Sequence, residues 1–168
     1  MDHLWSPWRY RYVSELLPEG APEPGCLFCR VLAASNDEEN FILLRAERNF
    51  VMLNRYPYTS GHLMVAPYAH VATLEDSDPE ALREMMLLVR RAEAALRSIY
   101  KADGLNIGMN IGRSAGAGVA GHIHMHVLPR WHGDVNFMTV VGETRVLPED
   151  LEVTYKRLWP LMNVNEHE

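Results

Sequence analysis

Residues 122–128, HIHMHVL, alternate histidine with apolar side chains, and this alternation constrains the fold more than any other segment. Successive side chains of a β-strand point to opposite faces of the sheet, so the segment predicts a strand with its apolar face in the core. We expect His122, His124 and His126 to form a row on the other face, with imidazoles about 7 Å apart at a rise of ~3.3 Å per residue. The alternative is a His-rich surface strand or an accidental metal site.

Short apolar runs rich in strand-forming residues predict the other strands. These runs are residues 41–44, 49–54, 62–66, 105–111 and 136–141. Residues 31–40 predict a short helix or loop, and residues 148–162 predict a closing helix. The order of strands, helix, strands and helix favours an α+β fold with a mainly antiparallel sheet.

Residues 78–101 predict the longest helix, because apolar side chains recur there at helical spacing. Ser77 and Glu80 form a capping-box pattern at its start, and Pro79 suits the first turn. Both methionines of this helix are expected to pack in the core.

The length of 168 residues suits a single domain, which we expect at residues 25–168 after an aromatic arm at residues 1–24. No apolar run approaches the ~18 residues of a membrane span, and the first residues lack the apolar segment of a secretory signal. We therefore expect a cytoplasmic protein without a membrane partner. The formal net charge of −6 argues against long DNA or RNA as a partner, because nucleic-acid binders carry a basic excess.

A glycine-rich stretch, GRSAGAGVAG at residues 112–121, comes directly before the histidine row. Glycines let the backbone approach a ligand closely, and backbone N–H groups can bind phosphate without net positive charge. The spacing matches neither a Walker A motif nor a dinucleotide fingerprint, so by itself it also suits an ordinary flexible loop. Beside three histidines, it predicts a phosphate cradle next to a nucleophile.

Cys26 and Cys29 are the chain's two cysteines and form a C-x-x-C pair. The pair is compatible with a redox dithiol, with two free thiols or with half of a zinc site. A redox pair of the thioredoxin type needs a βαβ setting, and no such unit is visible here. A structural zinc site needs four nitrogen or sulfur ligands, so two histidines would have to come from elsewhere in the chain.

The segment HIHMHVLPRW resembles the signature of the histidine triad family of nucleotidyl hydrolases and transferases, in which three histidines alternate with apolar residues. NRYPYTSGHLMVAP at residues 54–67 and NIG at residues 110–112 are similar to further motifs of that family. PRWHGDVNFM, TRVLPEDL and the opening LWSPWRYRYV resemble its bacterial branch that includes diadenosine tetraphosphate phosphorylases. The resemblance implies the histidine triad fold and a homodimer.

The resemblance also implies roles for individual residues. His124 would be the nucleophile on the α-phosphorus, His126 would contact the phosphate or bridging oxygen, and His62 would brace the triad loop. The remaining substrate-binding positions would be Asn54 on the ribose, Asn110 on the α-phosphate, and the backbone amides of residues 116–119, among them Gly116, Gly118 and Val119. No catalytic Mg²⁺ is required in this scheme. Zinc-bearing members of the family imply a structural zinc site made of Cys26, Cys29, His70 and His122.

The implied reaction is nucleotidyl transfer from a dinucleoside polyphosphate or another adenylylated compound to phosphate or water, through a covalent His124 intermediate. The chain departs from the family at Ala117 and Gly118, where many members carry Gln and Ser or Thr. One extra residue also lies between Asn110 and His122, and both differences bear on the leaving-group preference. The alternatives are a nucleotide-binding regulatory module with little turnover and a pure metal-binding protein.

Overall fold

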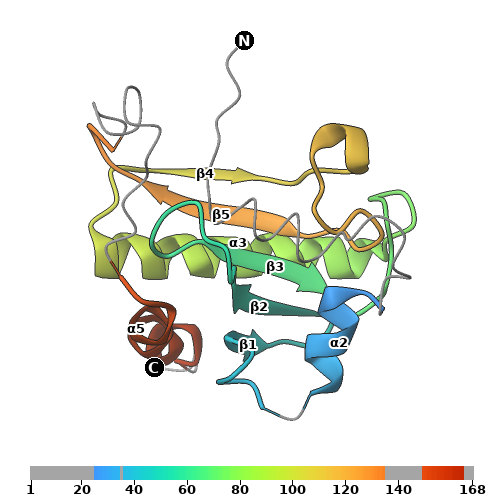
Figure 1. Ribbon diagram of the computed structural model, residues 1–168, viewed down its shortest axis with the longest axis horizontal. Coiled ribbons are helices and arrows are strands. Elements are labelled where there is room, and N and C mark those ends of the chain that lie inside the picture. The colour runs from blue at the N-terminus through green and yellow to red at the C-terminus, as the bar shows by residue number, and fades with distance from the viewer. Residues whose placement is uncertain (1–24, 35, 135–148, 165–168) are drawn as a thin grey trace.

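The computed structural model describes residues 25–34, 36–134 and 149–164, and its centre is a five-stranded sheet (Figure 1). The strands follow the order β1-β2-β3-β5-β4 across the sheet. Their bounds are Ile42–Arg45 for β1, Asn49–Leu53 for β2, Leu63–Pro67 for β3, Gly104–Gly108 for β4 and Met125–Arg130 for β5. Every neighbouring pair is antiparallel, which confirms the predicted α+β fold.

Helices cover both faces of the sheet (Figure 1). α3 (Pro79–Tyr100) and α5 (Leu151–Met162) pack on one face, whereas α2 (Leu27–Ala33) packs on the other. A short 3₁₀-helix, η1 (Arg113–Ala115), lies in the glycine-rich stretch. Within the described ranges, no helix combines the length and the apolar character that crossing a bilayer requires.

Strands β2 and β3 are buried along their whole length, because each of their two faces meets a helix layer. Side chains of these strands alternate between the two layers, as the pleat of a strand requires. The residues that pack with α3 and α5 are Val51, Leu53, Leu63 and Val65, and those that pack with α2 are Phe50, Met52, Met64 and Ala66. This two-sided burial explains why these segments are continuous apolar runs rather than alternating ones.

The predicted start of the long helix was wrong in detail. Asp78, not Ser77, is the N-cap residue, and its Oδ1 accepts a hydrogen bond from the Glu80 N–H at 3.1 Å. The Ser77 hydroxyl instead donates to the backbone carbonyl of Thr73. Only one of the two methionines packs in the core: Met85 is 1% exposed, whereas Met86 is 54% exposed because it lies on the outer side of α3.

Other predicted helix and strand boundaries also differ from those of the structure. The first helix covers Leu27–Ala33 rather than residues 31–40, the strand predicted at residues 105–111 ends at Gly108, and the strand predicted at residues 122–128 begins at Met125. The predicted arm at residues 1–24 and the predicted strand at residues 136–141 lie outside the described residues.

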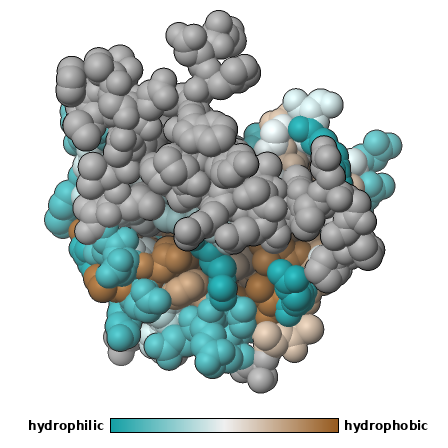
Figure 2. Space-filling model, viewed as in Figure 1, coloured by the Kyte–Doolittle hydropathy of each residue, from teal (hydrophilic) through white to brown (hydrophobic). Residues whose placement is uncertain are grey.

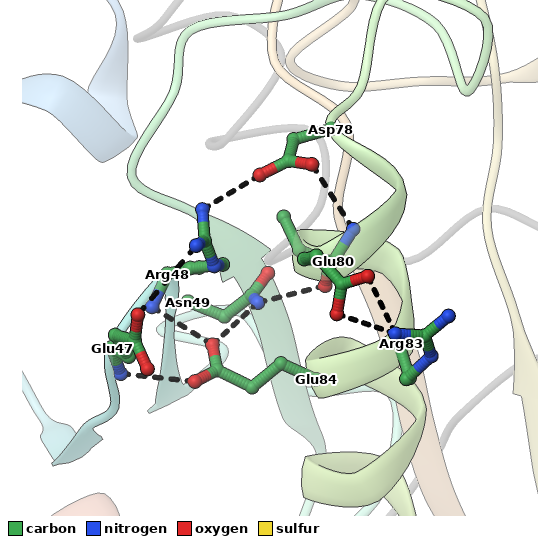
Figure 3. A network of polar contacts seen from close by, with 8 residues as sticks. Glu47, Arg48, Asn49, Asp78, Glu80, Arg83 and Glu84 are labelled. Atoms are coloured by element: carbon green, nitrogen blue, oxygen red, sulfur yellow. Dashed lines mark hydrogen bonds and ion pairs between the residues drawn. The ribbon is translucent and has the colours of Figure 1, made fainter.

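A polar network joins the connection between β1 and β2 to the first turns of α3 (Figure 3). The Glu84 carboxylate accepts hydrogen bonds from the backbone N–H groups of Glu47 and Arg48 at 3.0 and 2.9 Å and from the Asn49 side chain at 2.7 Å. Arg48 also forms an ion pair with the N-cap residue Asp78 at 2.7 Å. Because a carboxylate that accepts three N–H groups is strongly oriented, this network fixes α3 relative to the sheet.

Gly61, which directly precedes His62, occupies a position that only glycine suits. Its φ is +76°, and a Cβ there would lie 2.8 Å from the Tyr100 ring and 2.9 Å from Leu96. Tyr100 cannot easily move away, because its hydroxyl donates a hydrogen bond to the Glu149 carboxylate. Burial, together with this bond, raises the pKa of Tyr100 to about 12, so the hydroxyl keeps its proton. Close packing on α3 therefore sets the backbone from which His62 extends.

We expect Gly61→Ala to lower the free energy of unfolding by about 2–4 kcal/mol, because it adds both backbone strain and a steric overlap. Gly108→Ala is the matched control, since its Cβ would meet nothing within 4 Å and its φ is not positive. That control should change stability by about 0.5 kcal/mol or less. Urea denaturation of both variants is the measurement, and equal midpoints for the two would contradict the prediction.

Candidate active site and metal cluster

A cavity of about 400 Å³ opens on the face of the sheet that α2 covers. This volume lies in the range of small-molecule binding sites. The residues that α2 and its end contribute to the wall are Leu27, Phe28, Arg30, Val31 and Ala34. In the space-filling view, hydrophobic residues reach the surface beside α2 (Figure 2). The described lining also holds Arg55, His124 and His126 but no carboxylate, which suits an anionic ligand.

The histidine row lies on the α2 face of the sheet, as the alternation predicts. His126 pairs across the ladder with Met64, which packs with α2, and Val127 pairs with Leu63, which packs with α3. His122, His124 and His126 are 0%, 4% and 9% exposed. The ring centroids of His124 and His126 are 4.8 Å apart, closer than the expected 7 Å, because the two rings meet in a T-shaped contact.

His124 is neutral: a hydrogen bond holds one of its ring nitrogens, and the other nitrogen keeps its lone pair for a ligand. Its Nδ1 lies 3.0 Å from the backbone carbonyl oxygen of His122, which can only accept, so Nδ1 carries the proton. Burial lowers the pKa of His124, which keeps the imidazole neutral and its Nε2 lone pair available. Among the described residues, no other hydrogen-bond partner contacts this ring, and His124 lines the cavity.

His62 and His126 form a hydrogen-bonded pair with a defined direction. The backbone N–H of Tyr58 donates to His62 Nδ1 at 3.2 Å, so the proton of His62 lies on Nε2. His62 Nε2 then donates to His126 Nδ1 at 2.9 Å. His126 must therefore carry its own proton on Nε2. His126 lines the cavity, so its ring borders the space that a ligand would occupy.

The glycine-rich stretch brings Gly116, Gly118 and Val119 to the cavity wall. Gly116 has a φ of +88° and closes the turn of η1. The Gly116 and Ala117 N–H groups donate to the carbonyls of Arg113 and Gly112, so both are used inside the turn. For the N–H groups of Gly118 and Val119, no acceptor lies within the described part of the chain. Those two amides are the ones that a bound anion could use.

The asparagines predicted from the sequence lie in different surroundings. Asn54 lines the cavity, and its Oδ1 accepts a hydrogen bond from the Tyr56 N–H at 2.9 Å. Asn110 is half-buried and is not part of the described lining. His62 also lies behind the wall rather than in it, and it reaches the cavity through its hydrogen bond to His126.

The cavity wall that α2 provides was not predicted from the sequence. Leu27, Arg30, Val31 and Ala34 follow the spacing i, i+3, i+4 and i+7, which puts them on one face of a helix. This pattern is present in the sequence, but the helix or loop predicted there covers residues 31–40 and so leaves out Leu27 and Arg30. The side chains of Tyr56 and Tyr58 also line the cavity, and no periodicity marks them.

The four predicted metal ligands meet at one place, where Cys26, Cys29, His70 and His122 offer ligand atoms that all lie within 4.8 Å of one another. Cys26 Sγ lies 3.3 Å from His122 Nδ1, and Cys29 Sγ lies 3.4 Å from His70 Nδ1 and 3.8 Å from His122 Nδ1. In a tetrahedral zinc site with bonds of about 2.3 Å to sulfur and 2.0 Å to nitrogen, sulfur and nitrogen lie about 3.5 Å apart. The donor set and its spacing therefore fit a metal ion of this kind.

The surroundings of the cluster favour a ligand role for His122. Its Nε2 lies 2.8 Å from the Pro67 carbonyl oxygen, so Nε2 carries the proton and Nδ1 faces the sulfurs with its lone pair. Burial lowers the pKa of His122, and a neutral imidazole is the form that binds metal. Burial and the neighbouring Cys26 raise the pKa of Cys29. A bound cation would favour the thiolate and so offset this rise in the pKa.

The chain belongs to the histidine triad family, as the sheet with its row of three histidines already suggests. A family model described as "HIT domain" matches residues 35–133, which is more than half of the chain.

Several relatives carry printed names. The AP-4-A phosphorylase of Mycobacterium tuberculosis is 37% identical over 162 residues, which cover 94% of this chain and 83% of that protein. The bis(5'-nucleosyl)-tetraphosphatase (asymmetrical) of Schizosaccharomyces pombe is 30% identical over 93 residues, or 55% of this chain and 50% of that protein. These relatives place the chain among the enzymes of the family. A Zn-bound histidine triad family protein from Mycobacterium smegmatis has a similar structure, with a TM-score of 0.68, 29% identity, and coverage of 82% of this chain and 93% of that one.

The direction of the His62–His126 hydrogen bond leads to a spectroscopic prediction. We expect ¹H–¹⁵N spectra to show His126 with its proton on Nε2, because Nδ1 accepts from His62. In His62→Ala this acceptor loses its donor, so both tautomers of His126 should become populated. His132→Ala, which alters an exposed histidine outside the cavity, should leave the His126 signals unchanged. A wild-type His126 that already carries its proton on Nδ1 would contradict the assignment.

Proposed function

We propose that this chain transfers a nucleotidyl group from a dinucleoside polyphosphate, with diadenosine tetraphosphate as the model substrate, through a covalent intermediate on His124. The observation that carries the proposal is the neutral imidazole of His124, which lines the cavity with Nδ1 bound to the His122 carbonyl. Neutral imidazole is an effective nucleophile near pH 7. The relative named AP-4-A phosphorylase supports this choice of substrate.

The proposed reaction consists of two successive displacements at the α-phosphorus. His124 Nε2 forms a bond to phosphorus while the bond from phosphorus to the leaving polyphosphate oxygen breaks, and that oxygen, which His126 would contact, leaves as an anion while the His124 ring, still protonated on Nδ1, takes up the positive charge. In the second step, phosphate or water forms a new P–O bond and the P–N bond breaks, which returns His124 to its neutral form; a water acceptor releases its proton to solvent. His62 donates to His126 Nδ1 and so holds the ring of His126 in its Nε2–H tautomer.

The other cavity residues would bind and orient the nucleotide. The apolar wall of α2 suits the base, and Asn54 suits the ribose hydroxyls. The amides of Gly118 and Val119 would stabilise negative charge on the phosphoryl oxygens, which preorganised N–H groups do well in a partly buried site. These two amides replace the side-chain donors that Ala117 and Gly118 do not supply. A contact from Asn110 to the α-phosphate would require that residue to approach the cavity from outside its described lining.

Incubation with diadenosine tetraphosphate, with and without inorganic phosphate, tests the proposed function. We expect phosphate-dependent formation of ADP and ATP, because phosphate attack on an adenylyl-histidine yields ADP after ATP has left. Formation of AMP and ATP without phosphate would make water the acceptor. Tight binding of the substrate with no cleavage under either condition would favour a regulatory binding module instead.

His124→Asn should lower kcat by at least about 10³-fold, because it removes the attacking nitrogen, while nucleotide binding should change little. His132→Asn is the matched control, because it makes the same change at an exposed histidine outside the cavity. Steady-state kinetics together with calorimetric titration of a nucleotide would measure both effects. Comparable turnover in His124→Asn and the control would remove His124 as the nucleophile.

We further propose that the cluster of Cys26, Cys29, His70 and His122 holds a structural zinc ion. Bound zinc would cross-link the start of α2 to the segments that carry His70 and His122, and it would take no part in the displacement. All four positions would then be occupied by protein ligands, as in closed structural sites. The Zn-bound relative from Mycobacterium smegmatis supports the identity of the metal.

His70→Ala should abolish stoichiometric zinc and lower the melting temperature by several degrees, because a metal that binds only the folded state stabilises it. His132→Ala is again matched, since both histidines are exposed. Elemental analysis and thermal denaturation would measure the two effects. A wild-type protein that is fully stable without metal would contradict the structural role.

Three further expectations remain proposals. A homodimer would bury the outer edge of β4, which has no neighbouring strand within the described sheet and exposes Ile107. The exposed side chains of Met86 and Leu87 on α3 would also be buried by such a dimer. Residues 25–168 would form the single domain, and a cytoplasmic location remains an expectation from the sequence.

A further inference from the structure

Phe28 connects the metal cluster to the candidate nucleophile by direct ring contacts. It lies between Cys26 and Cys29 in the sequence and is 0% exposed. Its ring centroid lies 5.1 Å from that of His122 and 4.9 Å from that of His124. Both distances fall in the range of favourable aromatic contacts, and both ring pairs are tilted rather than stacked.

We propose that Phe28 is a positioning residue that holds the imidazole of His124 in the orientation needed for attack on phosphorus. This inference rests on the proposed function for its kinetic consequence, but the orientation itself can be measured without turnover. Phe28 does not act on the phosphate. It acts on the imidazole of His124, which attacks the phosphorus.

The imidazole of His124 has few other restraints. Its one hydrogen bond, from Nδ1 to the His122 carbonyl, fixes an edge of the ring but leaves it free to tilt about that edge. The His126 ring contacts it at 4.8 Å, and the cavity lies against another side. Phe28 therefore fills the space into which the ring would otherwise tilt. Productive attack requires the reacting atoms within about 3–3.5 Å and in line, so a small tilt has a large effect on rate.

The position of Phe28 depends in turn on the cluster. α2 has seven residues, and so short a helix has little stability of its own. Cys26 stands at its N-cap position and Cys29 lies within it, so ligation of both thiols would fix the backbone that carries Phe28. His122, whose carbonyl holds His124, belongs to the same cluster. The ring of His124 is thus held from two directions by segments that the cluster joins.

Phe50 offers a matched control for a substitution at Phe28. It is also 0% exposed, packs in the same group of buried side chains beneath α2, and contacts the Phe28 ring at 6.1 Å. It is not part of the described cavity lining, and no ring contact joins it to His124. Phe28→Leu and Phe50→Leu therefore remove the same atoms from the same core. Only the first removes the contact with the nucleophile.

The experiment compares the wild-type protein with Phe28→Leu, Phe50→Leu and Phe28→Tyr, the last of which keeps the ring. Three quantities are measured on each zinc-loaded protein: kcat and KM with diadenosine tetraphosphate, the zinc content, and the ¹H–¹⁵N signals of the His124 ring. We expect Phe28→Leu to lower kcat by at least about tenfold, since a misplacement of about 1 Å can cost 10²-fold. Its His124 signals should show mixed tautomers, whereas Phe50→Leu and Phe28→Tyr should keep the Nδ1–H tautomer and most of the wild-type kcat. Zinc content should be equal in all four proteins.

Three results would overturn the proposal. The first is the same kcat and the same His124 signals in Phe28→Leu and Phe50→Leu. The second is a rise in KM alone for Phe28→Leu, which would make Phe28 only a wall for the nucleotide. The third is loss of zinc from Phe28→Leu, which would place its role in the cluster. If the wild-type protein itself shows no turnover, the proposed function fails, and the His124 signals still decide the role of Phe28.

Discussion

The hydrogen bond from His124 Nδ1 to the His122 carbonyl oxygen, 3.0 Å long, determines what the rest of the site can do. A histidine side chain could direct either ring nitrogen toward a ligand. A backbone acceptor two residues away removes that choice, because a carbonyl oxygen can only accept. Burial then keeps the ring neutral. One short local contact thus leaves a neutral imidazole with its lone pair on Nε2, without a charged partner.

This contact depends on a sheet that is covered on both faces. α3 and α5 bury one side of β3 and β5, so the apolar residues of the alternating segment have a core to enter. The histidines are therefore turned toward α2, whose short length makes it an unusual partner for a sheet face. The proposed zinc ion on the cluster of two cysteines and two histidines would compensate for that short length. Phe28, which lies between the two cysteines, contacts the His124 ring and lines the cavity, so this short helix also shapes the cavity.

Much of this arrangement could be predicted from the sequence, because it depends on local patterns. The alternation at residues 122–128 specifies which side chains share a face, and the helical spacing at residues 78–101 specifies the long helix. The C-x-x-C pair was compatible with half of a four-ligand site, and both that interpretation and the positions of the two histidines came from family resemblance rather than from spacing. His70 and His122 are 52 residues apart in the chain, and only the folded sheet brings them together.

The features that the sequence did not reveal depend on tertiary packing. Met86 has the same apolar character as Met85, and only the orientation of α3 against the sheet decides that one is exposed and the other buried. The capping pattern of Ser77 and Glu80 was plausible, but Asp78 is one position closer to the helix and took the cap. The contact between Phe28 and His124 joins residues 96 positions apart, and no periodicity encodes it.

The central claim is that His124 Nε2 forms a covalent bond to the α-phosphorus of the substrate. Rapid quenching during turnover of diadenosine tetraphosphate, followed by mass spectrometry of the intact protein and of its peptides, tests this most directly. We predict an acid-labile adenylyl group attached to His124 within the first turnover. Turnover at the full rate with no adduct, or with an adduct on another residue, would contradict the account.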